Sequence, residues 1–309
     1  FKTDTEITPD GKNLSPRTLL DILAQQKASE MPKESVFYIP AQRILSIADG
    51  RPKNFMEFDW DTPYVLRRFS ETLRVFMQGG LGNPDIIFPM RNRLKGAVRN
   101  SITQTIFHNG KVIIDQAGNQ RKMKLEIDDM KIPFMAWSAG QKEFMPLLLG
   151  IYCLSGPPTQ VVNREDYEWV IIEEPEMGLH PQAIQSVLLE IIELIKNGYK
   201  VIVSTHSTTF PEFVWAFNNL QNLPEEDFKT AMSEIFGISM HSTAANLFDN
   251  LKGKNIKTFY SGKQTNSQGV TFADISTLDA LSNDADVDEW GGLSSFDGKS
   301  SEIVSRYGE

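Results

Sequence analysis

The sequence predicts an α/β protein with a mostly parallel sheet, and two apolar runs carry this prediction. Residues 169–172 are continuously apolar or aromatic, as expected for a strand covered on both faces, and "KVIVSTHS" at 200–207 begins with a second such run. Between them, Pro181 starts a helical pattern that Gly198 ends. A strand, a helix and a strand in this order imply parallel pairing.

The remaining elements follow from apolar spacing and turn residues. The first half of the chain is predicted to hold a helix over 14–26 capped by Ser15, a buried strand over 35–40, a loop over 48–62 and helices over 63–78 and 87–107. A hairpin over 111–127 that turns at Gly118–Asn119 follows, and then a short strand over 132–136 that leads through a turn into a long apolar helix. The last predicted element is a hairpin between "IKTFY" and "GVTFADI". We expect three parts: a core over 1–47 and 131–223, an inserted helical lobe with a hairpin over 48–130, and a small C-terminal extension over 224–309.

Composition narrows the class of protein. The net charge of −9 over 309 residues argues against a globally cationic nucleic-acid binder and leaves local basic patches open. The single cysteine, Cys153, excludes internal disulfides and a cysteine-based zinc site, which fits a reducing compartment. No apolar run reaches the roughly 18 residues of a membrane helix, and no signal-like segment opens the chain. We expect a cytoplasmic protein without a membrane partner.

Two adjacent glutamates end the first apolar run. Glu173 and Glu174 would lie at the carboxyl edge of a parallel sheet, where open α/β sheets bind ligands. One carboxylate can hold Mg²⁺ through water, while the next orients a water that attacks a phosphate. His206, in "STHS" after the next strand, would share this edge and could donate a hydrogen bond to a terminal phosphate. The alternatives are a surface or helix-capping acidic cluster for "EEPE" and a structural strand-end histidine.

A third segment, "WSAGQKE", combines small residues with a helix start. Ser138, Ala139 and Gly140 leave backbone N–H groups accessible, and the N-terminus of the following helix is an anion site. The alternative is an ordinary N-cap with a tight turn.

Together these residues resemble the ATP-binding-cassette (ABC) ATPase superfamily. "SAGQKE" is similar to its signature motif, "VIIEE" to its Walker B strand with the catalytic glutamate, "MGLHP" to its D-loop and "STHS" to its switch-histidine loop, in the same order. The glutamate pair followed by "PEMGLHP" is closest to soluble RecF-like and OLD-like ATPases, grouped with the AAA family, including those of bacterial anti-phage systems such as Septu and retrons. The motifs cover about residues 134–210, and "FYIPAQR" extends the similarity more loosely. The resemblance implies an ABC-ATPase-type nucleotide-binding core.

The resemblance also implies roles at the sheet edge. Glu173 takes the place of the usual Walker B aspartate and supports Mg²⁺ through water, Glu174 is the general base or orients the water, and His206 contacts the γ-phosphate. Gln42, at the end of a predicted strand, would be the Q-loop glutamine and a further Mg²⁺ contact. The adjacent Arg43 would either approach phosphate or pair with a carboxylate.

A nucleotide-sandwich homodimer follows from the same resemblance. Signature residues would meet the γ-phosphate of a nucleotide bound to a second subunit, and D-loop residues would cross the dimer interface. The first group is Ser138, Ala139, Gly140 and Gln141, and the second is Gly178, Leu179 and His180.

One expected motif is missing from the sequence. No segment matches the Walker A pattern G-x-x-x-x-G-K-[ST], which normally lies upstream of the other motifs. Because the chain starts at Phe1, we expect that N-terminal residues carrying this loop are absent from the sequence. The alternative is a degenerate ATPase.

We therefore expect hydrolysis of ATP to ADP and phosphate, with ATP and Mg²⁺ as ligands. The ATP state would be coupled to an effector protein or a nucleic acid, as in anti-phage defence. Two alternatives stay open: a RecF-like ATPase that acts directly on DNA in repair or recombination, and a non-hydrolysing ABC-type scaffold module.

Two charged segments complete the candidates. Seven basic residues could form a stripe on the lobe for nucleic acid, or a solvated helix face with local ion pairs: Arg67, Arg68, Arg74, Arg91, Arg93, Lys95 and Arg99. "DADVDE" at 284–289 lacks the glycine and distal glutamate of an EF-hand, so we expect an acidic loop there.

Overall fold

The computed structural model describes residues 35–81, 85–117, 120–159, 161–263, 270–279, 282 and 284–308. The chain divides into two compact units, Phe1–Ser35 and Val36–Glu309, and every element below belongs to the second. The predicted helix over 14–26 with its cap Ser15 and the predicted turn at Gly118–Asn119 lie outside the described residues.

A parallel sheet forms the centre of this unit. Its strands are β1 (Val36–Ile39), β8 (Trp169–Glu173) and β9 (Lys200–Ser204), in the order β1-β8-β9, and both neighbouring pairs are parallel. Glu173 lies opposite Ser204 at the end of the register. The predicted α/β fold with a parallel strand–helix–strand unit is therefore confirmed, and the three carboxyl ends share one edge.

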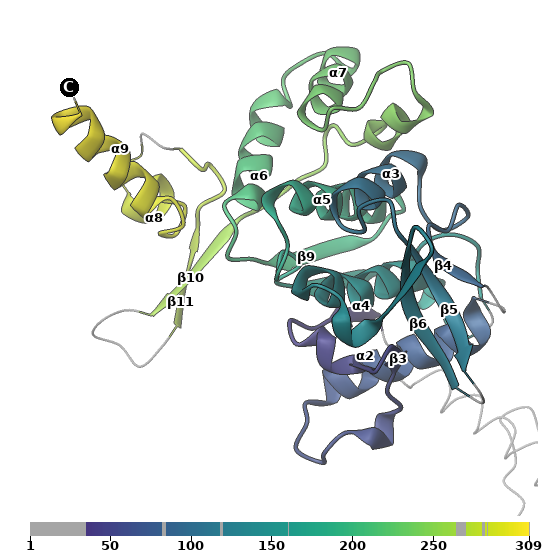
Figure 1. Ribbon diagram of the computed structural model, residues 1–309. Coiled ribbons are helices and arrows are strands. Elements are labelled where there is room, and N and C mark those ends of the chain that lie inside the picture. The colour runs from purple at the N-terminus through teal and green to yellow at the C-terminus, as the bar shows by residue number, and fades with distance from the viewer. Residues whose placement is uncertain are drawn as a thin grey trace, which may run out of the picture. The chain divides into compact units, whose positions relative to one another are not determined.

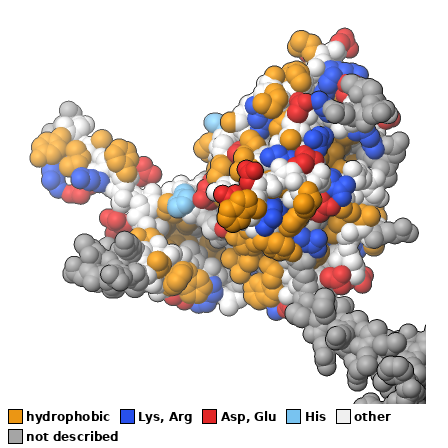
Figure 2. All heavy atoms as spheres, turned by 90° about the horizontal axis from the view of Figure 1, so that it is seen from below, with side chains coloured by type: hydrophobic (Ala, Val, Ile, Leu, Met, Phe, Trp, Pro, Cys, Tyr) orange, Lys and Arg blue, Asp and Glu red, His pale blue; other side chains and the backbone are white. Residues whose placement is uncertain are grey.

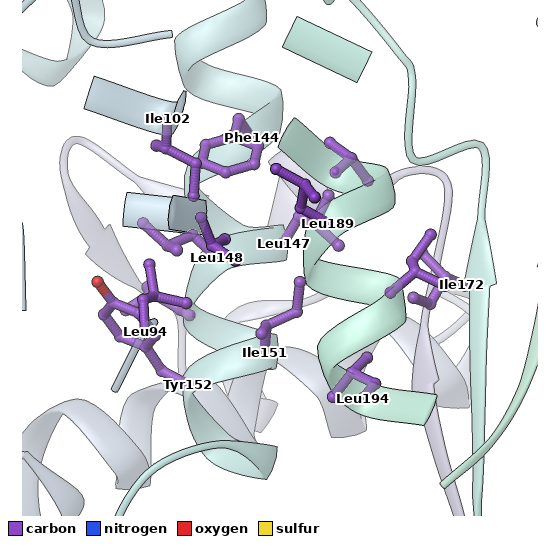
Figure 3. Close-up of a cluster of buried hydrophobic side chains, with 14 of the residues drawn as sticks. Leu94, Ile102, Phe144, Leu147, Leu148, Ile151, Tyr152, Ile172, Leu189 and Leu194 are labelled. Atoms are coloured by element: carbon purple, nitrogen blue, oxygen red, sulfur yellow. The ribbon is translucent and has the colours of Figure 1, made fainter. Parts of the chain in front are cut away.

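Two long helices cover one face of this sheet. They are α4 (Ala139–Leu154), capped by Ser138 as the sequence predicts, and α5 (Pro181–Lys196). Figure 3 shows Leu147 and Ile151 of α4 facing Leu189 and Leu194 of α5, with Ile172 of β8 beside α5. All five side chains are at least 98% buried, so these residues belong to the core.

The opposite face of the sheet is only partly covered by described residues. Tyr38, Ile171 and Ile202 form one row across the three strands, and the Ile202 side chain is 48% exposed. The predicted burial on both faces is therefore wrong within this part of the chain, because α4 and α5 pack against the same side.

The segment over 48–130 is less helical than predicted. It holds α2 (Tyr64–Val75), which a π-helical turn extends over Phe76–Gly80, and α3 (Gly96–Thr105). The rest is mostly strand. A short pair is formed by β2 (Ile47–Ala48), which begins just before this segment, and β3 (Arg51–Pro52). An antiparallel sheet is formed by β4 (Ile86–Phe88), β5 (Lys111–Ala117), β6 (Gln120–Ile127) and β7 (Met130–Pro133). Figure 1 shows β4, β5 and β6 side by side, apart from β9.

The expected helix over 87–107 thus begins nine residues later, at Gly96. The apolar residues at its predicted start form β4 and pair with β5. Pro89 follows directly, and its ring disfavours helical geometry at the residue before it. The apolar spacing that indicated one long helix comes from a strand, a turn and a shorter helix in succession.

The C-terminal part holds further helices and the second predicted hairpin. Its elements are α6 (Thr209–Leu220), α7 (Glu225–Ile235), the antiparallel pair β10 (Phe259–Lys263) and β11 (Val270–Asp274), α8 (Ala285–Asp288) and α9 (Ser295–Tyr307). The acidic run over 284–289 forms the single turn of α8 rather than a loop. No cluster of three His, Cys, Asp or Glu side chains that could hold a metal occurs in the described part of the chain. None of the described helices is both long and apolar enough to cross a membrane.

Candidate functional site

Polar residues follow each of the three parallel strands at their shared carboxyl edge. Gln42 lies after β1 and is exposed, where it begins a 3-10 turn over Arg43–Ser46. Glu174 and His206 follow β8 and β9, and 3.9 Å separates the Glu174 Oε1 and His206 Nε2 atoms. Their side chains are 35% and 83% exposed, so both can meet a ligand from solvent.

Glu173 is fixed through both carboxylate oxygens. The Tyr38 hydroxyl donates to Oε1, and the Ala41 backbone N–H donates to Oε2 at 3.0 Å. Burial, together with the hydrogen bond to this carboxylate, raises the pKa of Tyr38 to about 12, so the phenol stays a donor. Each oxygen accepts one hydrogen bond from the described residues and has a second lone pair, and carboxylate oxygen and water are the ligands that Mg²⁺ prefers. This half-buried carboxylate fits a water-mediated Mg²⁺ contact.

Glu174 has an unusual backbone conformation. Its φ is +41°, in the left-handed region that non-glycine residues seldom adopt. Its N–H donates to the Ser204 carbonyl at 2.9 Å, so β9 holds the turn in place. Such strain costs on the order of 1–3 kcal/mol and persists where the surrounding structure enforces it, often at functional sites.

Glu176, the third glutamate of "EEPE", joins the two loops of this edge. Its Oε1 atom accepts hydrogen bonds from the Thr205 hydroxyl at 2.7 Å and from the His206 N–H at 2.6 Å. Sequence reasoning left this residue without a role, although its position opposite "STHS" was a usable signal. Glu176 holds the backbone from which His206 projects.

Arg43 is the second residue whose place sequence reasoning missed. Its side chain is fully buried, and it donates to the carbonyls of Glu143, Glu173 and Glu174 at 3.1, 2.9 and 3.0 Å. Burial lowers the pKa of the guanidinium, and the carboxylates of Glu143, Glu176 and Glu174 oppose this. The two predicted roles, phosphate approach and carboxylate pairing, are therefore replaced by backbone contacts.

The "SAGQKE" segment starts α4 with a reciprocal cap. Ser138 Oγ accepts from the Gln141 N–H at 3.2 Å, and Gln141 Oε1 accepts from the Ser138 N–H at 3.1 Å. Gln141 is 8% exposed, and its Nε2 donates to the Ile106 carbonyl. The expectation that Gln141 meets a phosphate is thus wrong for its side chain, which points inward. Ser138 and Ala139 are exposed, and Gly140 is half-buried.

The predicted D-loop touches this turn within the same chain. Gly178 has φ +70°, which glycine adopts without steric cost, and it leads into the helix α5. A Cβ atom placed on Gly140 would lie 2.5 Å from the Gly178 carbonyl oxygen. Leu179 is half-buried beside the turn, and His180 caps α5 by accepting the Gln182 N–H at Nδ1, 3.3 Å away. Glycine at 140 therefore permits a close backbone approach.

The seven basic residues do not share one surface. Arg93 is 5% exposed and donates to the carbonyls of Tyr152, Ser155 and Pro157. Arg74 forms an ion pair with Glu71. Figure 2 shows Lys and Arg side chains mixed with Asp and Glu side chains on the face that it views. Arg93 is a core residue, so it fits neither a basic stripe nor a solvated helix face.

Comparisons with known proteins bear on this site. A family model described as "AAA domain, putative AbiEii toxin, Type IV TA system" matches residues 45–210, which include the turn before α4 and the ends of β8 and β9. A protein named Old nuclease, from Escherichia phage P2, is 44% identical over 59 residues, which are 19% of this chain and 10% of that protein. No solved structure matches the chain.

Proposed function

Because the chain belongs to the AAA domain family that matches it over residues 45–210, we propose that it hydrolyses ATP to ADP and phosphate with Mg²⁺. The observation that carries the proposal is the pair of Glu174 and His206, 3.9 Å apart at the carboxyl edge of the parallel sheet, beside the fixed carboxylate of Glu173. An acid–base group, a hydrogen-bond donor and an ion-binding carboxylate at one edge are three of the groups that phosphoryl transfer to water uses.

Each side chain has a distinct task in this proposal. Glu173 holds Mg²⁺ through water, and the exposed Gln42 is a further candidate contact for the ion. When bound, Mg²⁺ neutralises the charge that develops on the phosphate oxygens. Glu174 orients the attacking water and accepts its proton, and His206 donates a hydrogen bond to the terminal phosphate. Glu176 keeps the His206 backbone in position.

The turn before α4 would act on the nucleotide of a second subunit. Ala139 and Gly140 place backbone N–H groups at the N-terminus of a 16-residue helix, which attracts anions. The Ser138 N–H donates to Gln141, so the exposed Ser138 would contribute its hydroxyl instead. Gly178, Leu179 and His180 would lie at the same interface, since Gly178 contacts Gly140. We therefore propose a homodimer that closes on two nucleotides.

The wider role of the ATPase is also a proposal. One matched relative is named a nuclease and the family description names a toxin, so we propose that ATP state controls an effector protein or a nucleic acid, as anti-phage defence would require. An ATPase that acts directly on DNA is the second candidate, favoured by the same nuclease relative. In either case we expect a cytoplasmic protein.

The test is Glu174→Gln in the full-length protein. The amide keeps the size of the side chain but cannot accept the proton, so turnover should fall by about 100-fold or more while ATP binding is kept. Phosphate release and nucleotide binding measure the two effects. Glu168→Gln is the matched control, because Glu168 is 56% exposed and forms a surface ion pair with Lys200. Wild-type turnover in Glu174→Gln would show that the assignment is wrong.

A further inference from the structure

The Arg43 side chain donates hydrogen bonds to backbone carbonyls of two separate elements. Nε donates to Glu143 in α4, whereas the two terminal nitrogens donate to Glu173 and Glu174 at the end of β8. The side chain has no exposed surface. A guanidinium is a rigid planar fork, so these three bonds fix the relative positions of the two elements.

The bonds are not a by-product of charge neutralisation. Glu143 and Glu176 lie close enough to favour the charged guanidinium, yet each keeps one buried carboxylate oxygen without a hydrogen-bond partner among the described residues. Burial raises the pKa of Glu143, and Arg43 opposes that shift. The three Arg43 hydrogen bonds go to backbone carbonyls instead. Arg43 therefore holds the backbone of the two elements.

On the β1 side of β8, no strand among the described residues pairs with Glu173 or Glu174, whose carbonyls Arg43 reaches. β1 ends at Ile39, opposite Ile172, so it cannot pair with the two residues that follow in β8 and its turn. Arg43 comes four residues after Ile39 and supplies donors where the strand stops. Because Glu174 has the left-handed φ of +41°, its carbonyl accepts from the same guanidinium as that of Glu173. Arg43 thus stabilises the strained turn that aims the Glu174 carboxylate.

The other end of the contact lies in the first turns of α4. Glu143 is four residues after Ala139, at the start of the helix whose N-terminus would meet a phosphate. We propose that Arg43 is a positioning residue that links the Ser138–Gly140 turn to Glu174. When a second subunit contacts this turn, Arg43 fixes the orientation of the Glu174 carboxylate. The inference rests on the proposed function and adds a route by which dimer closure sets the catalytic geometry.

Arg43→Lys in the full-length protein tests the inference. Lysine keeps the charge, but one ammonium cannot span three carbonyls. We expect kcat to fall by about 100-fold, as for other losses of positioning, with the ATP dissociation constant changed by less than about threefold. Arg51→Lys is the matched control, since Arg51 is 41% exposed and pairs with Glu57. A purely structural role would lower the thermal midpoint while kcat per folded subunit stays at the wild-type value, and that result would overturn the proposal.

Parallel measurements separate this inference from the proposed function. If Glu174→Gln hydrolyses ATP at the wild-type rate, the proposed function itself is wrong. If Glu174→Gln is inactive and Arg43→Lys keeps the wild-type kcat, only the positioning role fails.

Hydrogen exchange gives a readout that does not need an Arg43 variant to fold. In the ATP-trapped Glu174→Gln dimer, the backbone amides of residues 173, 174, 176 and 177 should exchange more slowly than in the same protein carrying Ala139→Arg, which blocks approach at the exposed turn. Equal exchange over 173–177 in these two proteins would overturn the proposal.

Discussion

Glu173 and Glu174 are neighbours in the chain, yet their carboxylates have different surroundings. Glu173 accepts two hydrogen bonds that fix it, whereas Glu174 projects from a left-handed turn with its Oε1 atom 3.9 Å from His206 Nε2. A fixed carboxylate suits an ion held through water, and a less constrained one suits proton transfer. The proposed division of roles thus follows from backbone geometry at one residue.

Glu190 is a buried carboxyl group that the proposed reaction does not use. It is fully buried in α5, and neither of its oxygens has a hydrogen-bond partner within the described residues. Burial raises its pKa well above the ordinary value of 4.5, and the nearby Glu193 acts in the same direction. The folded state therefore binds a proton that the unfolded chain releases near pH 4.5.

This predicts how stability depends on pH. Because the folded pKa is raised, the stability that protonated Glu190 provides is fully present below about pH 4.5 and is lost as pH rises toward the folded pKa. The slope is at most about 1.4 kcal/mol per pH unit for one proton. Glu190→Gln removes the titration, so its unfolding free energy, measured in urea, should exceed that of the wild type by a margin that grows above pH 4.5. A constant difference from pH 4.5 to pH 8 would contradict a raised pKa.

At the scale of elements, local patterns were enough for helix ends but not for long-range contacts. The capped start of α4, the Pro181 start of α5 and the strands β8 and β9 were predicted, because each depends on residues within a few positions. The inward turn of Gln141 depends on the Ile106 carbonyl, 35 residues away. The bonds of Arg43 reach 100 and 131 residues along the chain. No local pattern contains that information.

The start of α4 can be tested as an element that acts on another subunit. Ala139→Arg should fill the exposed turn and abolish turnover without unfolding the subunit, whereas Gly140 is unsuitable because any side chain there meets Gly178. Mixing Ala139→Arg with Glu174→Gln creates dimers with one intact composite site. Equal random mixing should restore about a quarter of wild-type phosphate release, if each site works alone.

Ala139→Ser is the control for that mixture, since its small side chain leaves the turn accessible and should keep turnover near the wild-type value. If Ala139→Arg alone keeps wild-type turnover, the segment is an ordinary helix start. No recovery on mixing, with heterodimers verified by mass spectrometry, would argue against a shared site.

At the scale of the whole molecule, the described edge supplies only part of a nucleotide site. Glu173, Glu174 and His206 face the terminal phosphate and its ion in our proposal. Most of the binding energy in such sites comes from a loop of backbone N–H groups and a lysine around the phosphates. No G-x-x-x-x-G-K-[ST] segment occurs in the 309 residues. The sequence thus predicted which residues gather at this edge of the sheet without predicting how the molecule would hold a nucleotide.

Residues 1–309 alone should therefore bind Mg-ATP with a dissociation constant weaker than about 1 mM, which corresponds to less than about 4 kcal/mol of binding free energy. Without the ion, the carboxylates of Glu173 and Glu174 repel the phosphates of ATP. No compensating loop of N–H groups follows a described strand. Calorimetric titration of the purified chain measures the constant. Glu173→Gln provides the comparison, because loss of the ion-binding carboxylate should change little when binding is already weak. A dissociation constant in the micromolar range would mean that another segment of this chain cradles the phosphates, and a loss of that binding in Glu173→Gln would place it at this edge.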